Sequence, residues 1–351
     1  MNNAVIQRIK DFQKFLKKAQ LSGYVALSAT ELRYFTGIYH LDKGEVVLLI
    51  TSKQVYAFTK KLLALELKQF SFLKTKIAKG DMLGDALDFA RKTHLLHVAF
   101  NPSVVDFVEG EKLVKAGLSR LNGAVEDLRT CKYTDETERI KKACQIAASA
   151  FAEVKPQIKT GMSEEDVRIL IATAMTKHGA HSIPFNIVSF GENCADCHHM
   201  PSAKRKLKKN DAVLMDFGCY YQGYCSDMTR SWWHGDKEPA EYTKIWHLVH
   251  MAKESAVKRL QENTPLAEID KTARDVIEDA GYGEYFIHTT GHGIGLHVHE
   301  SPILRKNGIG TLEENNVVTV EPGIYLPGKY GVRLEDSYLV TKKGAKNLTE
   351  K

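Results

Sequence analysis

Residues 213–230 read VLMDFGCYYQGYCSDMTR, two apolar runs that each carry one aspartate and are joined by a short polar turn. This pattern predicts two antiparallel strands. If Tyr221 and Gln222 form the turn, Asp216 and Asp227 fall directly opposite each other. Opposed residues have Cβ atoms about 4.5 to 5.5 Å apart, and like charges at that distance repel. A positive group is therefore expected between these two acids.

A second acidic hairpin is predicted in residues 317–336, VVTVEPGIYLPGKYGVRLED. A turn centred on Gly328 sets Glu321 against Glu335. Burying four ionised carboxylates requires cations or protonation. Apart from Arg333 near Glu335, no cation flanks the acids within their strands, so divalent metal fits best. The alternative is that the acids are solvent-facing strand residues, and two such hairpins weaken it.

Between the hairpins lies a histidine enclosed by glycines, in TTGHGIGLHVHESP, residues 289–302. Gly291 and Gly293 let the backbone approach its neighbours closely and give the imidazole of His292 a fixed direction, as a metal ligand needs. The segment is a weak match to a phosphate-binding loop, because no Lys followed by Ser or Thr comes after it. Four carboxylates and one imidazole form an oxygen-rich site without thiolate, which suits Mn(II) or Co(II) at least as well as zinc. Mn is the metal expected, with Co, Zn and Fe as the alternatives.

These motifs resemble those of the pita-bread metallopeptidase family, which includes methionine aminopeptidase, aminopeptidase P and prolidase. The resemblance covers essentially the whole chain. It implies an α/β (α+β) fold with an N-terminal creatinase-like α/β domain, residues 1–125, and a C-terminal pita-bread catalytic domain, residues 126–351. It also implies two divalent metal ions per chain, with Asp227 and Glu335 shared by both ions or nearly so. The implied metal ligands are Asp216, Asp227, His292, Glu321 and Glu335.

The resemblance further implies a division of catalytic roles. A metal-bridging water or hydroxide attacks the scissile carbonyl, because two cations lower its pKa and polarise the substrate. Glu321 would carry the proton from that water to the leaving nitrogen. Two histidines that are not ligands, His199 and His299, would bind the substrate carbonyl and the developing oxyanion. His199 is chosen for its position 17 residues before Asp216.

A competing motif overlaps this region, because Cys194, Cys197 and His198 spell Cys-x-x-Cys-His, the attachment pattern of c-type haem. Haem attachment requires export, and no export signal is recognised. A zinc site would need further ligands. We therefore interpret the pattern as a coincidence within a substrate-binding loop.

The composition suits a two-domain globular protein. The chain has 351 residues, of which 43% are hydrophobic and 26% charged. Short β-rich runs alternate with helical stretches in the first part, a long helix is expected after the boundary near residue 125, and Ser163 with Asp166 predicts the start of another helix. From Ile183 onward we expect strands and hairpins.

Net charge, cysteine content and the length of apolar runs limit which cellular location and which partners are expected. The net charge of +6 comes from scattered basic residues, so no nucleic-acid partner is expected. The first residues predict an amphipathic helix and no signal peptide, and no apolar run reaches the roughly 20 residues that span a bilayer. Six cysteines without an export signal favour reduced thiols and the cytoplasm.

The N-terminal domain separates this chain from methionine aminopeptidases and is typical of proline-directed peptidases. Creatinase-like relatives and non-catalytic peptide-binding scaffolds of the same fold lack the metal ligands, all five of which stand here. We therefore expect a Xaa-Pro aminopeptidase acting on peptides with proline at the second position. The alternatives are a Xaa-Pro dipeptidase and, in another class, a peptide-binding scaffold. Because relatives are often homodimers, a homodimer is expected.

One departure from the family pattern bears on substrate length. In several prolidases an arginine, placed after the proline that follows the His-Glu pair, clamps the carboxylate of a dipeptide. Here HESPILR puts Ile303 at that position, and an isoleucine cannot pair with a carboxylate. Arg305, two residues further on, could substitute if the loop bends. Longer peptides are therefore expected to be preferred.

Overall fold

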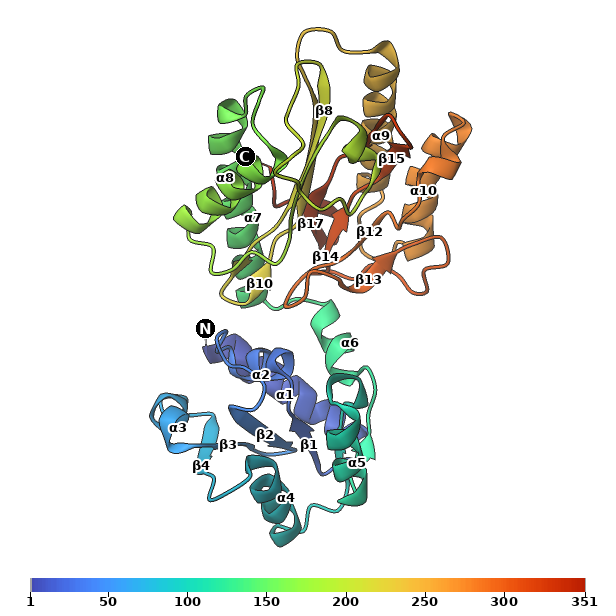
Figure 1. Cartoon of the computed structure of the whole chain (residues 1–351). Helices are drawn as coiled ribbons and strands as arrows, with labels where there is room; N and C mark the ends of the chain where they lie inside the picture. Colours follow the sequence, from blue (N-terminus) through green and yellow to red (C-terminus); the bar gives the residue numbers. More distant parts are fainter. Residues whose placement is uncertain (1, 351) are drawn as a thin grey trace. The chain divides into compact units, whose positions relative to one another are not determined.

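The computed structural model of the protein describes residues 2–350. The chain divides into two compact units, Met1–Leu128 and Arg129–Lys351 (Figure 1). The mixed α/β class expected from the sequence is confirmed. Among the described residues there is no helix long and apolar enough to cross a membrane.

The first unit is a six-stranded mixed sheet with helices on both faces (Figure 1). Alternate side chains of β1 (Gly23–Ala26) and β2 (Val46–Thr51) face opposite ways. Val25 and Leu49 pack with α4 (Met82–Lys92), while Tyr24 meets Phe12 of α1 (Asn2–Lys18) edge to face. The strand order is β4-β3-β2-β1-β5-β6, formed by Gly23–Ala26 (β1), Val46–Thr51 (β2), Val55–Thr59 (β3), Leu73–Ile77 (β4), Val98–Phe100 (β5) and Ser119–Arg120 (β6). The helices are Asn2–Lys18 (α1), Ala29–Thr36 (α2), Lys61–Leu67 (α3), Met82–Lys92 (α4), Phe107–Lys115 (α5) and, at the junction along the chain, Ala124–Thr130 (α6).

The second unit places two helix pairs against antiparallel strands (Figure 1). Helices Thr134–Val154 (α7) and Glu164–Lys177 (α8) pack on the sheet β11-β8-β7, formed by Asn186–Phe190 (β7), Asp211–Phe217 (β8) and Met228–His234 (β11). Helices Ala240–Val257 (α9) and Leu266–Asp279 (α10) pack on the later strands, Gly291–Gly293 (β12), Glu300–Leu304 (β13), Val317–Val320 (β14), Gly323–Leu326 (β15), Tyr330–Arg333 (β16), Asp336–Thr341 (β17) and Gly344–Asn347 (β18). Two short strands, Tyr220–Tyr221 (β9) and Tyr224–Cys225 (β10), form a hairpin between β8 and β11.

The predicted start of α8 is confirmed. The Ser163 hydroxyl accepts from Asp166 N, and the Asp166 carboxylate accepts from Ser163 N, which is a complete capping box. The expectation of strands and hairpins from Ile183 onward is incomplete, because α9 and α10 interrupt them. Both helices follow a proline, Pro239 and Pro265, and have no side-chain cap. The N-cap position of each helix therefore holds a proline in place of the usual Ser, Thr, Asp or Asn.

Candidate metal centre and active site

The first acid pair lies near the end of β8 and just before β11, in a register that differs from the prediction. Asp216 pairs with Thr229, two residues beyond Asp227. The turn between β9 and β10 consists of Gln222 and Gly223, with φ of 48° and 84°. A two-residue turn of this kind requires positive φ at both positions, which glycine adopts freely and tyrosine does not. The prediction that Tyr221 and Gln222 form the turn was therefore wrong.

The two acids nevertheless remain close together in the observed register. Because side chains alternate with a period of two, a shift of two residues leaves Asp227 on the same side as Asp216. Burial and the charges of Glu335 and Asp216 raise the pKa of Asp227 well above its usual range. The two carboxylates are thus close and diagonal to each other, where the sequence predicted direct opposition.

The second acidic hairpin is confirmed. Leu326 pairs with Tyr330 around Gly328, and Val320 pairs with Asp336 on the other side of the acids. The same register on both sides places Glu321 across from Glu335. Burial and the charges of Glu321 and Asp216 raise the pKa of Glu335 well above its usual range.

His292 sits where two neighbouring strands approach its backbone. A Cβ on Gly291 would lie 2.0 Å from the Thr319 carbonyl oxygen, and one on Gly293 would lie 2.3 Å from that of Ser301. Only glycine fits at both positions, as the sequence indicated. The Nδ1 of His292 lies 3.1 Å from the Gly293 carbonyl oxygen, which can only accept, so Nδ1 carries the proton and donates.

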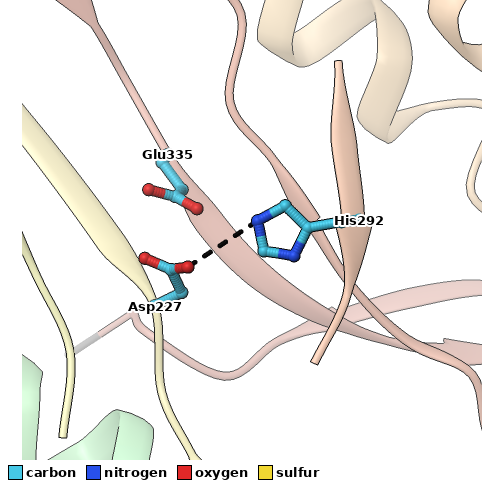
Figure 2. A group of neighbouring side chains, drawn as sticks. All are labelled: Asp227, His292 and Glu335. Carbon is cyan, nitrogen blue, oxygen red and sulfur yellow. Dashed lines mark ion pairs between the residues drawn. The ribbon is translucent and has the colours of Figure 1, made fainter. Parts of the chain in front are cut away.

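The other imidazole nitrogen faces the acids. Nε2 of His292 lies 3.1 Å from Glu321 Oε1 and 3.7 Å from Asp227 Oδ2. Figure 2 shows the ring directed toward Asp227, with the Glu335 carboxylate beside it. One potential ligand atom from each of Asp227, His292 and Glu335 lies within 4.8 Å of the others. All five predicted ligands line one cavity of about 590 Å³.

The donor set fits divalent cations. The buried atoms Asp216 Oδ1 and Glu335 Oε1 have no hydrogen-bond partner among the described residues. Burying carboxylate oxygens without partners is unfavourable, and cations would compensate them. The raised pKa values of Asp227 and Glu335 have the same origin, since burial and neighbouring negative charge penalise the ionised form.

One protein cation also reaches this cluster. The Arg333 guanidinium is paired with Asp216 Oδ2, donates to the Thr229 hydroxyl at 3.0 Å and donates to the Tyr325 hydroxyl at 2.8 Å. The Thr229 hydroxyl in turn donates to Glu335 Oε2 at 2.7 Å. The charge expected near Asp216 is therefore partly supplied by Arg333, which leaves Oδ1 of Asp216 to the cavity.

The predicted substrate-binding histidines lie in different surroundings. His299 lines the cavity, and its ring meets that of His292 edge to face with centroids 4.3 Å apart. His199 is not among the residues that line the cavity, and its Nε2 lies 2.8 Å from Glu164 Oε2. The adjacent His198 lines the cavity instead.

Sequence reasoning assigned no catalytic role to His198, because a spacing argument cannot separate adjacent histidines in an irregular loop. The Cys-x-x-Cys-His pattern is divided between two environments. Cys194 is buried and donates to the Ser189 carbonyl, whereas Cys197 and His198 line the cavity. All six cysteines are free.

The comparisons with known proteins agree with this geometry. Residues 138–342 match the family described as metallopeptidase family M24, and residues 8–131 match the creatinase/prolidase N-terminal domain. A fold of these two domains with a cluster of acids and a histidine defines a metallopeptidase of the pita-bread class. This chain belongs to metallopeptidase family M24.

Several relatives match along almost the whole chain. A curated Xaa-Pro dipeptidase from Pyrococcus furiosus is 30% identical over 347 residues, which cover 98% of each chain. A solved Xaa-Pro dipeptidase from Bacillus anthracis is 31% identical, with a TM-score of 0.93 over 99% of this chain and 98% of that one. A solved X-Pro aminopeptidase from Thermotoga maritima is 29% identical, with a TM-score of 0.88 over 95% and 96%.

Proposed function

We propose that the protein hydrolyses the bond between an N-terminal residue and proline, using two divalent cations. The observation that carries the proposal is the single cavity lined by Asp216, Asp227, His292, Glu321 and Glu335. In this proposal the five residues would hold the cations, with Asp227 and Glu335 shared between them. A non-catalytic scaffold would not need buried acids left without partners. When bound, the cations would polarise the scissile carbonyl and make the attacking water more acidic.

The remaining side chains have separable tasks in this proposal. Burial acts to raise the pKa of Glu321, but its bond with His292 and the nearby charges of His292, His288 and Arg333 lower it to about 2. An ionised Glu321 can accept a proton from water and return it to the leaving nitrogen. Burial and the charge of His292 lower the pKa of His299, so its imidazole is neutral at pH 7 and can donate a hydrogen bond to the substrate oxygen.

We assign the second substrate contact to His198 in place of His199. His198 lines the cavity, and its charge contributes to the lowered pKa of His299, so the two imidazoles border the same space. His199 does not line the cavity, and its Nε2 is bonded to the buried Glu164.

Substrate length divides the proposal into two candidates. A dipeptidase is the first candidate, because Xaa-Pro dipeptidases from Pyrococcus furiosus and Bacillus anthracis match over 98% and 99% of this chain. An aminopeptidase for longer peptides is the second candidate. It is favoured by Ile303, which lines the cavity, while Arg305 is exposed and is not among the lining residues. An apolar wall gives the free carboxylate of a dipeptide no partner.

A panel of Xaa-Pro dipeptides, Xaa-Pro tripeptides and matched Xaa-Ala peptides tests the proposal. The broken bond should be identified by mass spectrometry, after addition of Mn(II), Co(II) or Zn(II) to chelator-treated protein. Metal-dependent cleavage before proline supports the activity, and the ratio of kcat/KM for dipeptides and tripeptides separates the candidates. Full activity in metal-depleted protein, or equal cleavage of Xaa-Ala, would contradict it.

Three further assignments belong to this proposal. Mn(II) is the favoured metal because the donor set is rich in oxygen and free of thiolate. A cytoplasmic location fits six free cysteines. We also propose a homodimer, and a division into an N-terminal domain of residues 1–125 and a catalytic domain of residues 126–351.

A further inference from the structure

A buried carboxylate at the start of α8 binds the loop that forms one wall of the cavity. Glu164 is the first residue of α8 and is fully buried. Its Oε1 accepts from Phe190 N at 2.9 Å and from Asn193 Nδ2 at 2.8 Å. Its Oε2 accepts from His199 Nε2 at 2.8 Å and from Ser202 N at 3.0 Å. A carboxylate offers about four lone-pair sites, and all four are used here.

The four donors enclose the residues that face the cavity. They belong to residues 190–202, which run from the end of β7 through the 3₁₀ turn Gly191–Ala195 and which we call the Glu164 loop. Cys197 and His198 line the cavity and lie between the donors Asn193 and His199 along the chain. The loop is therefore tied to α8 on both sides of His198.

The direction of the His199 bond is fixed by its partner. Nε2 of His199 lies 2.8 Å from Glu164 Oε2 and 3.1 Å from Asn193 Nδ2. A carboxylate oxygen without a proton only accepts, so the proton is assigned to Nε2 of His199, and Asn193 Nδ2 donates to Glu164 Oε1. With Nε2 engaged in this way, His199 is bonded to the helix and does not line the cavity. Its next neighbour, His198, is exposed to the cavity.

We infer that Glu164 and His199 are positioning residues, which hold the Glu164 loop so that the imidazole of His198 meets the peptide substrate. The inference rests on the proposed function. It goes beyond the metal site, because neither residue lines the cavity. A displacement of about 1 Å at a reacting centre can cost about 10²-fold in rate, which gives this anchor its effect on turnover.

The first test replaces the acceptor. Glu164→Gln puts an amide NH₂ where a carboxylate oxygen accepts two bonds, so two donors of the loop lose their partner and the loop shifts. We expect kcat for an Xaa-Pro peptide to fall about 10- to 100-fold, with metal content unchanged. Glu165→Gln is the matched control, since Glu165 is the next residue of the same helix and pairs with Arg168 at the surface. It should leave kcat unchanged.

A second pair of variants separates positioning from direct catalysis. His199→Gln retains a donor near the position of Nε2, whereas His199→Ala retains none. If His199 acts through Glu164, the Gln variant should recover most of the turnover that the Ala variant loses. Equal loss in both variants would show that the imidazole itself touches the substrate, and would overturn the inference. In both variants Glu164 still accepts hydrogen bonds from its other three donors. The His199 variants therefore test the inference even if Glu164→Gln does not fold.

A double-mutant cycle supplies the decisive readout. In a His198→Ala background, Glu164→Gln should cost less than about 3-fold, because the residue through which it acts is already gone. The inference would be overturned if the losses in kcat caused by Glu164→Gln and His198→Ala multiplied in the double variant. Loss of metal in Glu164→Gln would also overturn it. Wild-type kcat in His198→Ala would also overturn it, while leaving the proposed activity intact. Absence of metal-dependent Xaa-Pro cleavage by the wild-type protein would instead contradict the proposed function.

Discussion

Nε2 of His292 lies 3.1 Å from Oε1 of Glu321, so two predicted ligands of the same metal centre form an ion pair with each other. Burial acts to lower the pKa of His292, but the bond and charge of Glu321 outweigh it, and the net pKa is raised. Metal can bind Nε2 only after this proton has left.

Metal affinity should therefore rise with pH. The raised pKa values of His292, Asp227 and Glu335 all mean that the metal-free cluster holds protons at a higher pH than isolated side chains do. Protons compete with metal below these pKa values, so the apparent Kd should fall as pH rises from about 6 to 8. Calorimetry in buffers of different ionisation enthalpy should record proton release. Proton uptake, or an affinity independent of pH, would contradict the predicted ligands.

Replacing Glu335 should remove metal and activity but stabilise the metal-free protein. Gln keeps an oxygen to accept from Thr229 and removes a buried negative charge next to Glu321. Glu335 has a folded-state pKa above its unfolded value, so metal-free stability falls as pH rises from the unfolded pKa through the folded one. The Tm of metal-free Glu335→Gln should therefore exceed that of the metal-free wild type by a margin that grows with pH. Each kcal/mol of difference in the free energy of unfolding corresponds to about 2 to 4 °C in Tm.

The control for this comparison is Glu165→Gln, which alters a partly exposed carboxylate paired with Arg168. It should change neither metal content nor, at pH values well above the ordinary Glu pKa of about 4.3, the pH dependence of Tm, because the pKa of Glu165 is lowered by its bond with Arg168 and the group stays ionised there. Full metal occupancy with normal turnover in Glu335→Gln, measured by elemental analysis and peptide cleavage, would remove Glu335 from the proposed ligands.

His299→Ala should lower turnover without loss of metal. Its ring packs against that of His292. In the proposed mechanism its imidazole, whose pKa is lowered by burial and by the charge of His292, donates to the substrate oxygen. Loss of one such donor typically costs about 10²- to 10³-fold in kcat. Kinetics and elemental analysis on the same preparation separate the two effects. Metal loss together with activity loss would identify His299 as a ligand.

Ile303→Arg should shift preference toward dipeptides. Ile303 lines the cavity, and an arginine there could form a bidentate pair with the C-terminal carboxylate of Xaa-Pro. We expect the ratio of kcat/KM for Xaa-Pro over Xaa-Pro-Xaa to increase about tenfold or more, which corresponds to the roughly 1.5 to 3 kcal/mol of a charged hydrogen bond. Ile303→Gln is the control for size without charge. An unchanged ratio would show that the carboxylate lies elsewhere.

Much of the fold and of the metal cluster could be predicted from the sequence. The second hairpin follows from a turn at Gly328, and the glycines around His292 follow from the close approach of Thr319 and Ser301. Buried acids in apolar strands are so costly without cations that their presence alone indicates a metal centre. These inferences depend on local rules of chain geometry and on solvation.

Other features were decided only by the tertiary structure. The turn at Gln222 and Gly223 corrected the register, yet the period of two kept Asp216 and Asp227 on one side. No sequence pattern could tell that Arg333 reaches Asp216 from another strand. Such contacts join residues that are distant in the chain, and their geometry depends on how the strands pack.

The two adjacent histidines, His198 and His199, also show which features the sequence determines and which the tertiary structure decides. The sequence by itself determined that a histidine-bearing loop precedes the first acidic strand, and the residue types determined what chemistry it could perform. Whether His198 or His199 faces the cavity depends on the path of an irregular loop, which has no periodicity to predict it. That path is set by four hydrogen bonds to Glu164, a carboxylate on a separate helix that only folding brings to the loop.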